Sequence, residues 1–215
     1  STNQLLRDMA ANIRLVASAP ELVSGDLKNF HNRTQSALRH SSLYVLLVDR
    51  DGQQLLNTRV PYGAKLGATS HKESLAEVLE NKQLTVSDVF FGKTSGQWVF
   101  NVLLPVPDDA AESAALIVTR NADEVASLIS TDSLPEGWSA AILDGANRVV
   151  ASTGPDQAGT GEPFDERLVD NFDSFSGVTR TIIKGEKILS GYTKLPGWSW
   201  TAVAWGSVVS GQQAI

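Results

Sequence analysis

One segment of the chain recurs in its second half, and this repeat limits the possible folds more than any other feature. VDRDGQQLLNT (48–58) aligns without gaps with LDGANRVVAST (143–153), at an offset of 95 residues. Both copies place a residue that tolerates positive φ, Gly52 or Asn147, at the same step. An internal repeat of this length predicts two copies of one supersecondary unit, each with its own small core.

The segments around each copy have the lengths and patterns of strands and short helices. LYVLLVD (43–49) and QQLLNT (53–58) flank an Asp-Gly pair, which is a strong hairpin signal. The pattern then predicts a helix over Glu73–Asn81 and strands over 85–91, 97–106 and 113–119. The second half predicts a helix near Glu166–Asn171 and strands over 177–184, 187–193 and 199–205. This is the element order of a PAS-like module, present twice.

The first 40 residues predict a helical region. Apolar residues on one face of the first helix are Leu5, Met9, Ile13 and Val16, and a second helix is expected from Asp26 to Leu38. These helices either pack only against the rest of the fold or form a stalk that also pairs with a partner chain. We therefore expect class α+β: a long N-terminal helix, then two tandem PAS-like modules, each a mostly antiparallel five-stranded sheet with helical caps. The expected domains are 1–40 (helical stalk), 41–125 (first module) and 126–215 (second module).

Composition excludes several classes of protein. The 215 residues include no cysteine, which excludes a disulfide scaffold, thiol catalysis and cysteine-ligated zinc. The formal charge of −6 provides no basic surplus for nucleic acid, so no nucleic-acid partner is expected. No stretch approaches the roughly 18 apolar residues that a membrane helix needs.

No residue pattern predicts catalysis, a metal or a cofactor. Gly92-Lys93-Thr94 resembles the end of a phosphate-binding loop, but Ser87 stands where the first glycine is required. The three histidines have no metal-ligand spacing, and we expect His31 and His40 on helix surfaces. There is no nucleophile elbow. We therefore expect this chain not to be an enzyme by itself.

Four segments of the chain, which include the two hairpins, resemble a known family. They are LYVLLVDRDGQQLLNTRVPYG (43–63), VSDVFFGKTSGQWVFNVLLPV (86–106), SAAILDGANRVVAST (139–153) and GYTKLPGWSW (191–200). In this order the chain resembles the double Cache (double PDC) sensor domains of bacterial transmembrane receptors. ASAPELVSGDLKNFHNRTQSAL (17–38) is similar to the helical region of sensor histidine kinases of this type.

The resemblance implies a location and a role. It implies an extracytoplasmic (periplasmic) sensing domain of an inner-membrane histidine kinase in two-component signalling, flanked by two transmembrane helices. The first module would be membrane-distal and the second membrane-proximal, and the parent would be a homodimer through the N-terminal helix. The alternatives are the sensor domain of a chemoreceptor or cyclic-dinucleotide enzyme, and a soluble periplasmic binding protein. Arg59-Val60-Pro61-Tyr62 stands where the amino-acid-sensing subset has Arg-x-Trp-Tyr, so amino-acid binding is not carried over.

The predicted roof of the first module, residues 59–83, is rich in groups that bind anions. Four of its five notable side chains can carry positive charge in a chain of negative net charge. This favours a small organic anion or zwitterion held by charge-assisted hydrogen bonds, with a solvated loop face as the alternative. The predicted ligand-binding residues of the roof are Arg59, Tyr62, Lys65, His71 and Lys72.

Strand parity leaves open which face of 97–106 lines the pocket. If the even-numbered residues face it, Trp98, Asp88 and Phe90 form its walls; otherwise Asn101 is its polar group. In the second roof, 154–176, six carboxylates accompany one arginine, so we expect the first module to hold the ligand.

Overall fold

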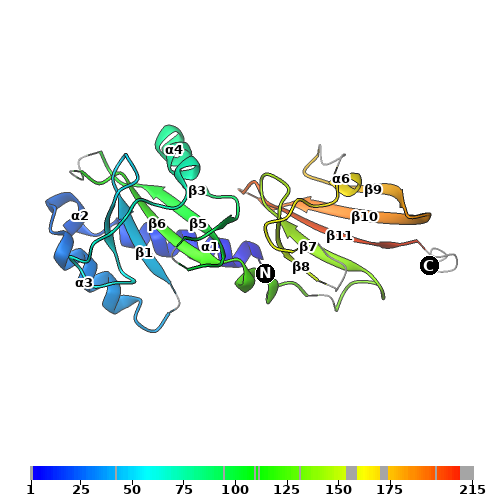
Figure 1. Ribbon diagram of the computed structural model, residues 1–215, viewed down its shortest axis with the longest axis horizontal. Helices are drawn as coiled ribbons and strands as arrows, with labels where there is room; N and C mark the ends of the chain where they lie inside the picture. The colour runs from blue at the N-terminus through cyan, green and yellow to red at the C-terminus, as the bar shows by residue number, and fades with distance from the viewer. Residues whose placement is uncertain are drawn as a thin grey trace. The chain divides into compact units, whose positions relative to one another are not determined.

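The computed structural model describes residues 2–41, 43–93, 95–108, 110, 112–130, 132–153, 159–169, 174–196 and 198–208. Contacts divide the chain into two compact units, one of Gln4–Arg120 and one of Asn121–Ile215 together with Ser1–Asn3. Each unit is built on one antiparallel sheet (Figure 1). The expected α+β class, with an N-terminal helix and two antiparallel sheets, is confirmed.

The first unit has helices on a sheet with strand order β2-β1-β6-β5-β3, with β4 also paired to β5. Its helices are α1 (Thr2–Ala17), α2 (Pro20–Ser24), α3 (Leu27–Ala37) and α4 (Lys72–Asn81). Its strands are β1 (Tyr44–Val48), β2 (Gln54–Asn57), β3 (Thr85–Val86), β4 (Phe90–Phe91), β5 (Trp98–Pro105) and β6 (Ala115–Asn121). In Figure 1, α1 runs behind the strands.

The N-terminal helices bury a somewhat different face from the one expected. Leu6, Met9 and Ile13 are fully buried in α1, whereas Leu5 is only half-buried. Pro20 is the first residue of α2, where its missing N–H costs nothing. The Asp26 side chain accepts a hydrogen bond from the Asn29 backbone N–H and so starts α3.

The segment 85–91 does not form the single strand that the sequence predicts. It is divided into β3 and β4 because Ser87 replaces a regular ladder contact with a side-chain one. Ser87 Oγ accepts the Asn101 N–H at 2.9 Å, while the Ser87 N–H donates to the Asn101 carbonyl at 2.8 Å. The first sheet therefore has six strands instead of the expected five.

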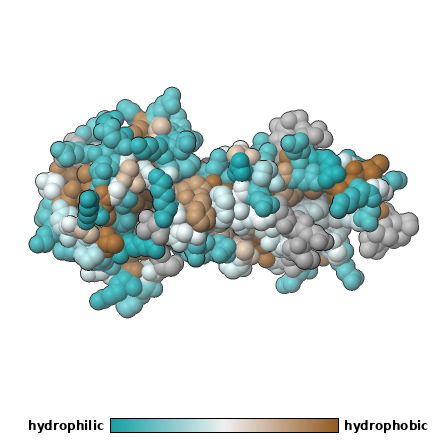
Figure 2. Space-filling model, viewed as in Figure 1, coloured by the Kyte–Doolittle hydropathy of each residue, from teal (hydrophilic) through white to brown (hydrophobic). Residues whose placement is uncertain are grey.

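The second unit contains a five-stranded sheet of order β8-β7-β11-β10-β9. Its strands are β7 (Ser139–Leu143), β8 (Val149–Ser152), β9 (Ser176–Ile183), β10 (Glu186–Lys194) and β11 (Thr201–Ser207). Its helices are α5 (Asp123–Ala126) and α6 (Glu166–Val169). Residues 170 and 171 of the predicted helix lie outside the described residues. Figure 2 shows apolar surface over β9, where Val178 and Ile182 are 62% and 65% exposed.

The hairpin turns of the two units are built in the same way. Asp49 Oδ1 accepts the backbone N–H groups two and four residues later, both at 2.9 Å. Asp144 Oδ1 does the same, also at 2.9 Å. Gly52 (φ 84°) and Asn147 (φ 58°) both adopt the left-handed conformation that the turn requires. The predicted repeat is thus confirmed at the level of individual hydrogen bonds.

The match continues beyond the hairpins. Thr58 Oγ1 accepts the N–H of residue 45 at 2.9 Å, and Thr153 Oγ1 accepts that of residue 140 at the same distance. Further on, the Thr69 N–H donates to the Gly52 carbonyl at 2.7 Å, and the Phe164 N–H donates to the Asn147 carbonyl at 3.0 Å. The offset of 95 residues therefore holds in space at these described positions of both units.

Candidate functional site

Helix α4 covers one end of one face of the first sheet. The other end of the same face borders a cavity. Leu75 and Val78 of α4 pack with Val48 and Leu103 in an apolar cluster. Beyond this cluster lies a cavity of about 50 Å³. It is lined by Tyr44, Leu46, Gln54, Asn57, Arg59, Thr69, Ser70, Phe90, Gly92, Ser95, Val99, Asn101, Ile117 and Thr119. We call this the inner cavity.

Amide side chains in the inner cavity are oriented by their own hydrogen bonds. The Arg59 backbone N–H donates to Asn57 Oδ1 at 2.9 Å, and Asn57 Nδ2 donates to Gln54 Oε1 at 3.1 Å. A backbone N–H can only donate, which fixes both amide orientations. Among the described residues, Gln54 Nε2 then donates to no protein group. The Thr119 hydroxyl donates to Asn101 Oδ1 at 2.7 Å.

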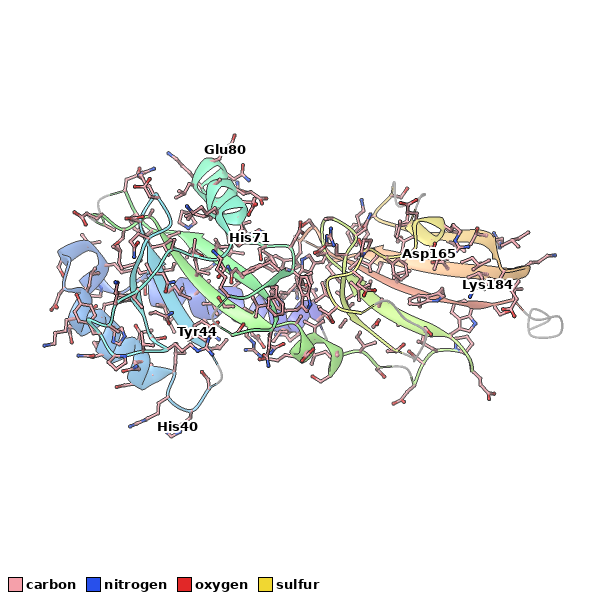
Figure 3. All side chains as sticks on the ribbon, in the orientation of Figure 1. His40, Tyr44, His71, Glu80, Asp165 and Lys184 are labelled. Atoms are coloured by element: carbon pink, nitrogen blue, oxygen red, sulfur yellow. The ribbon has the colours of Figure 1, made fainter. Side chains whose placement is uncertain are left out.

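Arg59 is the charged group of the inner cavity. Its side chain is exposed, and its guanidinium carbon lies 5.1 Å from the centre of the Tyr44 ring, in a cation–π contact. Arg59 forms no ion pair with any described carboxylate. A second cavity of about 340 Å³, which we call the outer cavity, shares Tyr44 and Arg59 and is also lined by Arg39. The Arg59–Tyr44 pair therefore borders both cavities, and Figure 3 labels Tyr44 on β1.

The turn that carries Arg59 is held by α3. His31 Nε2 lies 3.1 Å from the Asn57 carbonyl oxygen and 2.9 Å from that of Val60, and Gln35 Nε2 donates to the Thr58 carbonyl at 2.8 Å. His31 is fully buried, so its predicted place on the helix surface is wrong. The reason is that His31 lies one helical turn before the buried Thr34, on the side of α3 from which its ring reaches the two carbonyl groups. His40 is exposed, as expected, but it lies in the turn after α3 and not on a helix.

The structure brings together only some of the predicted site residues. Arg59, Phe90 and Asn101 line the inner cavity. Lys65 and Lys72 are exposed on the roof segment and do not line it, nor does Asp88. Lys65 and Lys72 thus fit the alternative, in which part of the roof is a solvated face.

The two aromatic residues Tyr62 and Trp98 also lie outside the lining. Tyr62 is 41% exposed, with its ring 5.6 Å from that of His31. Trp98 contacts the edge of Phe91 at 5.8 Å between ring centres. The odd-numbered residues of β5 face the cavity, which is the alternative that places Asn101 there.

His71 contacts the inner cavity only indirectly, through Phe90, which lines it. Its Nδ1 accepts the Ser74 N–H at 3.3 Å and so caps α4, while its ring stacks on Phe90 at 4.7 Å (Figure 3). His71 itself does not line the cavity; it supports the Phe90 wall.

Sequence reasoning missed several polar lining residues, namely Tyr44, Gln54, Asn57, Thr69 and Thr119. A signal was present, because Thr119 is a polar residue at the end of an apolar strand. However, its position opposite Tyr44 depends on the pairing of β1 with β6, which are far apart in sequence.

The matching region of the second unit is filled by aromatic rings. Phe164 stands at the position of Thr69, given the offset of 95 residues. Ser139 matches Tyr44 by the same offset. Thr119 is the sheet partner of Tyr44, and Trp205 is the sheet partner of Ser139. Trp205 therefore takes the place of Thr119. The two rings meet edge to face at 5.0 Å between centres. Val149 stands at the position of Gln54, so the amide donor is also missing.

The charges of the second roof also do not favour an anion. Arg167 donates two hydrogen bonds to the Asp165 carboxylate, from Nη2 at 2.6 Å and from Nε at 2.9 Å. This side-chain hydrogen bonding from Arg167 holds the pKa of Asp165 below its ordinary value. The arginine is thus already paired.

The second unit has a larger hollow of another kind. It measures about 680 Å³ and lies on the sheet face away from Phe164, lined by small and apolar residues such as Ala140, Ala202 and Gly191. Its described lining contains no charged side chain. It therefore offers no charge-assisted hydrogen bond to a small ion.

Two further searches of the described part of the chain gave negative results. No group of three or more histidine, aspartate or glutamate side chains there is arranged to hold a metal ion. No helix among the described residues combines the length and apolar character needed to cross a membrane.

Comparisons with known proteins identify the fold. No family model matches the chain, and no curated protein matches it. The extracellular domain of rpHK1S-Z16, assigned as a histidine kinase, is similar over 98% of this chain and 88% of its own, at 16% identity and a TM-score of 0.66. The ligand-binding domain of Mlp24 with asparagine is similar over 95% of this chain and 86% of its own, at 19% identity and a TM-score of 0.68.

A third similar structure is the ligand-binding domain of the Pseudomonas aeruginosa PAO1 amino acid chemoreceptor PctB in complex with L-Arg. It covers 99% of this chain and 84% of its own, at 13% identity and a TM-score of 0.70. Identities this low establish the fold alone. The chain therefore has the tandem PAS-like, double Cache fold of bacterial sensor domains.

Proposed function

We propose that this chain is an extracytoplasmic small-molecule sensing domain, and that the inner cavity of the first unit is its ligand site. The observation that carries this proposal is the presence of Arg59, without a described carboxylate partner, on a cavity lined by amide and hydroxyl groups. Charge-assisted hydrogen bonds from such an arginine favour a small organic anion or zwitterion. Two of the similar domains carry an amino acid in their structures, which supports a small organic ligand.

The parent protein is proposed to be a membrane-bound sensor histidine kinase, with phosphotransfer performed by another part of it. The similarity of residues 17–38 to the helical region of such kinases and the rpHK1S-Z16 domain support this. Two transmembrane helices flanking the domain belong to the same proposal. A chemoreceptor is the second candidate, favoured by the Mlp24 and PctB domains.

A thermal-shift screen of organic acids, amino acids and amines on this chain tests the ligand site. We expect at least one anionic compound to raise the melting temperature. Arg59→Ala should abolish that increase while leaving the unliganded melting temperature nearly unchanged, because the Arg59 side chain is exposed.

Lys65→Ala is the matched control, since it removes the same charge from the same roof outside the cavity. It should leave the response intact. Equal responses of wild type and Arg59→Ala to every compound would refute the assignment of the site.

The parent is further proposed to form a homodimer through the N-terminal helix. Leu15 is 74% exposed on α1, and Gln4, Asp8 and Ala11 are exposed on the same face. Cysteines placed in full-length protein at Ala11 and Leu15 should crosslink between chains. Cysteines at the buried Met9 and Ile13 should not. Equal crosslinking at all four positions, or none at any, would contradict this interface.

A further inference from the structure

We propose that the inner cavity selects small carboxylates that carry a hydroxyl or carbonyl oxygen next to the carboxylate, and rejects the corresponding amino acids. This inference rests on the proposed ligand-sensing function and specifies the chemical class of the ligand. It distinguishes two possibilities, a simple anion and a zwitterion, that the presence of Arg59 alone leaves open.

The first argument is the balance of charge. Arg59 is the one charged residue in the described lining of the inner cavity, and Arg39 is the other in the described lining of the outer cavity. Neither lining contains an aspartate or glutamate among its described residues. An ammonium group brought into this site would lose its water without gaining a counter-charge, which is strongly unfavourable. The carboxylate of the same ligand would gain Arg59.

The second argument is the balance of hydrogen-bond donors and acceptors. Gln54 Oε1, Asn57 Oδ1 and Asn101 Oδ1 each already accept a hydrogen bond from the protein. One of the two lone pairs on each of these amide oxygens is thus already used, which leaves less acceptor capacity for an ammonium. In contrast, Gln54 Nε2 donates to no described group and is available to the ligand. A hydroxyl or carbonyl oxygen accepts from such an amide, whereas an ammonium has no acceptor to offer.

The third argument is size. A cavity of about 50 Å³ has room for only a few water molecules. A ligand of a few heavy atoms, with its carboxylate at Arg59 on the border of the outer cavity, fits this space. Carboxylates of two or three carbons are small enough for the cavity and can place the carboxylate at Arg59.

Matched pairs of probes test this selectivity. Glycolate and glycine, and L-lactate and L-alanine, differ only by a hydroxyl in place of an ammonium. Isothermal titration of the whole chain should give at least tenfold tighter binding for the hydroxy acid of each pair. Arg59→Ala should weaken the binding of L-lactate at least tenfold, and Lys65→Ala should leave it within twofold of wild type.

Ser70→Asp provides a second, independent test. Ser70 lines the inner cavity, and the matching position in the second unit is the aspartate Asp165, so the backbone there is compatible with this residue. The new carboxylate supplies the missing counter-charge. We expect the ratio of L-lactate affinity to L-alanine affinity to fall at least tenfold in this variant.

The outcomes separate this inference from the proposed function. Arg59-dependent binding of L-alanine or glycine as tight as that of the hydroxy acid would overturn the selectivity but leave ligand sensing intact. Absence of detectable binding by all four probes at about 10 mM, tenfold above a millimolar dissociation constant, would also overturn it. An unchanged affinity ratio in Ser70→Asp would count against it as well. The proposed function itself fails only if no compound of the wider screen gives Arg59-dependent stabilisation.

Discussion

Thr69→Phe is expected to abolish ligand-induced stabilisation completely. Thr69 is buried and lines the inner cavity, and Phe164 stands at the matching position of the second unit. The larger ring fills the space that a ligand needs. A compound present at a hundredfold excess over its dissociation constant stabilises the wild-type fold by about 2.7 kcal/mol, and this contribution should vanish. Overpacking should lower the unliganded stability by about 1–3 kcal/mol.

Thr193→Phe is the matched control. It makes the same change at an exposed position on the rim of the apolar hollow in the second unit. Thermal shift with the stabilising compound from the screen should be unchanged in Thr193→Phe and absent in Thr69→Phe. The reverse result would place the ligand on the second sheet and contradict the proposed site.

Much of the fold could be predicted because its signals are local. The turns that begin at Asp49 and Asp144 contain, three residues apart, both the aspartate that accepts two backbone N–H groups and the residue with positive φ, Gly52 or Asn147. The same chemistry recurs 95 residues later, so the two-module architecture follows from the sequence. The division of 85–91 into two strands could not be predicted, because it depends on the contact of Ser87 with a residue of another strand.

The candidate site was predictable only in part, for a related reason. Arg59 was identified because it is one of the cations of the predicted roof, residues 59–83. The role of Asn101 depended on strand parity, which is fixed by Leu103 of the same face packing against α4. Gln54 and Thr119 line one cavity because β2 and β6 both pair with β1, and local sequence does not show this pairing. Lys65 and Lys72 carry the right charge, but they are exposed and do not line the cavity.

The two units differ in the side chains that occupy the same region of the repeat. In the first, Thr69, Thr119 and Gln54 leave a polar hollow; in the second, Phe164 and Trp205 close it. The backbone hydrogen bonds around these positions are the same. The difference therefore lies in side-chain volume and polarity, so a ligand site in one unit and a filled core in the other are compatible with one backbone.

Phe164→Ala is accordingly expected to cause a large loss of stability. Phe164 is 6% exposed and packs with Leu168, Tyr192 and Trp205 in the core of the second unit. Removing a buried phenylalanine ring loses its transfer free energy and leaves a cavity, which together cost about 3–5 kcal/mol. Urea unfolding should show this decrease. Phe175→Ala, at a position 57% exposed in the same unit, should change stability by less than about 0.5 kcal/mol. A decrease of similar size in both variants would mean that Phe164 does not fill the core in the way that the repeat implies, and the contrast between the two units would lose its basis.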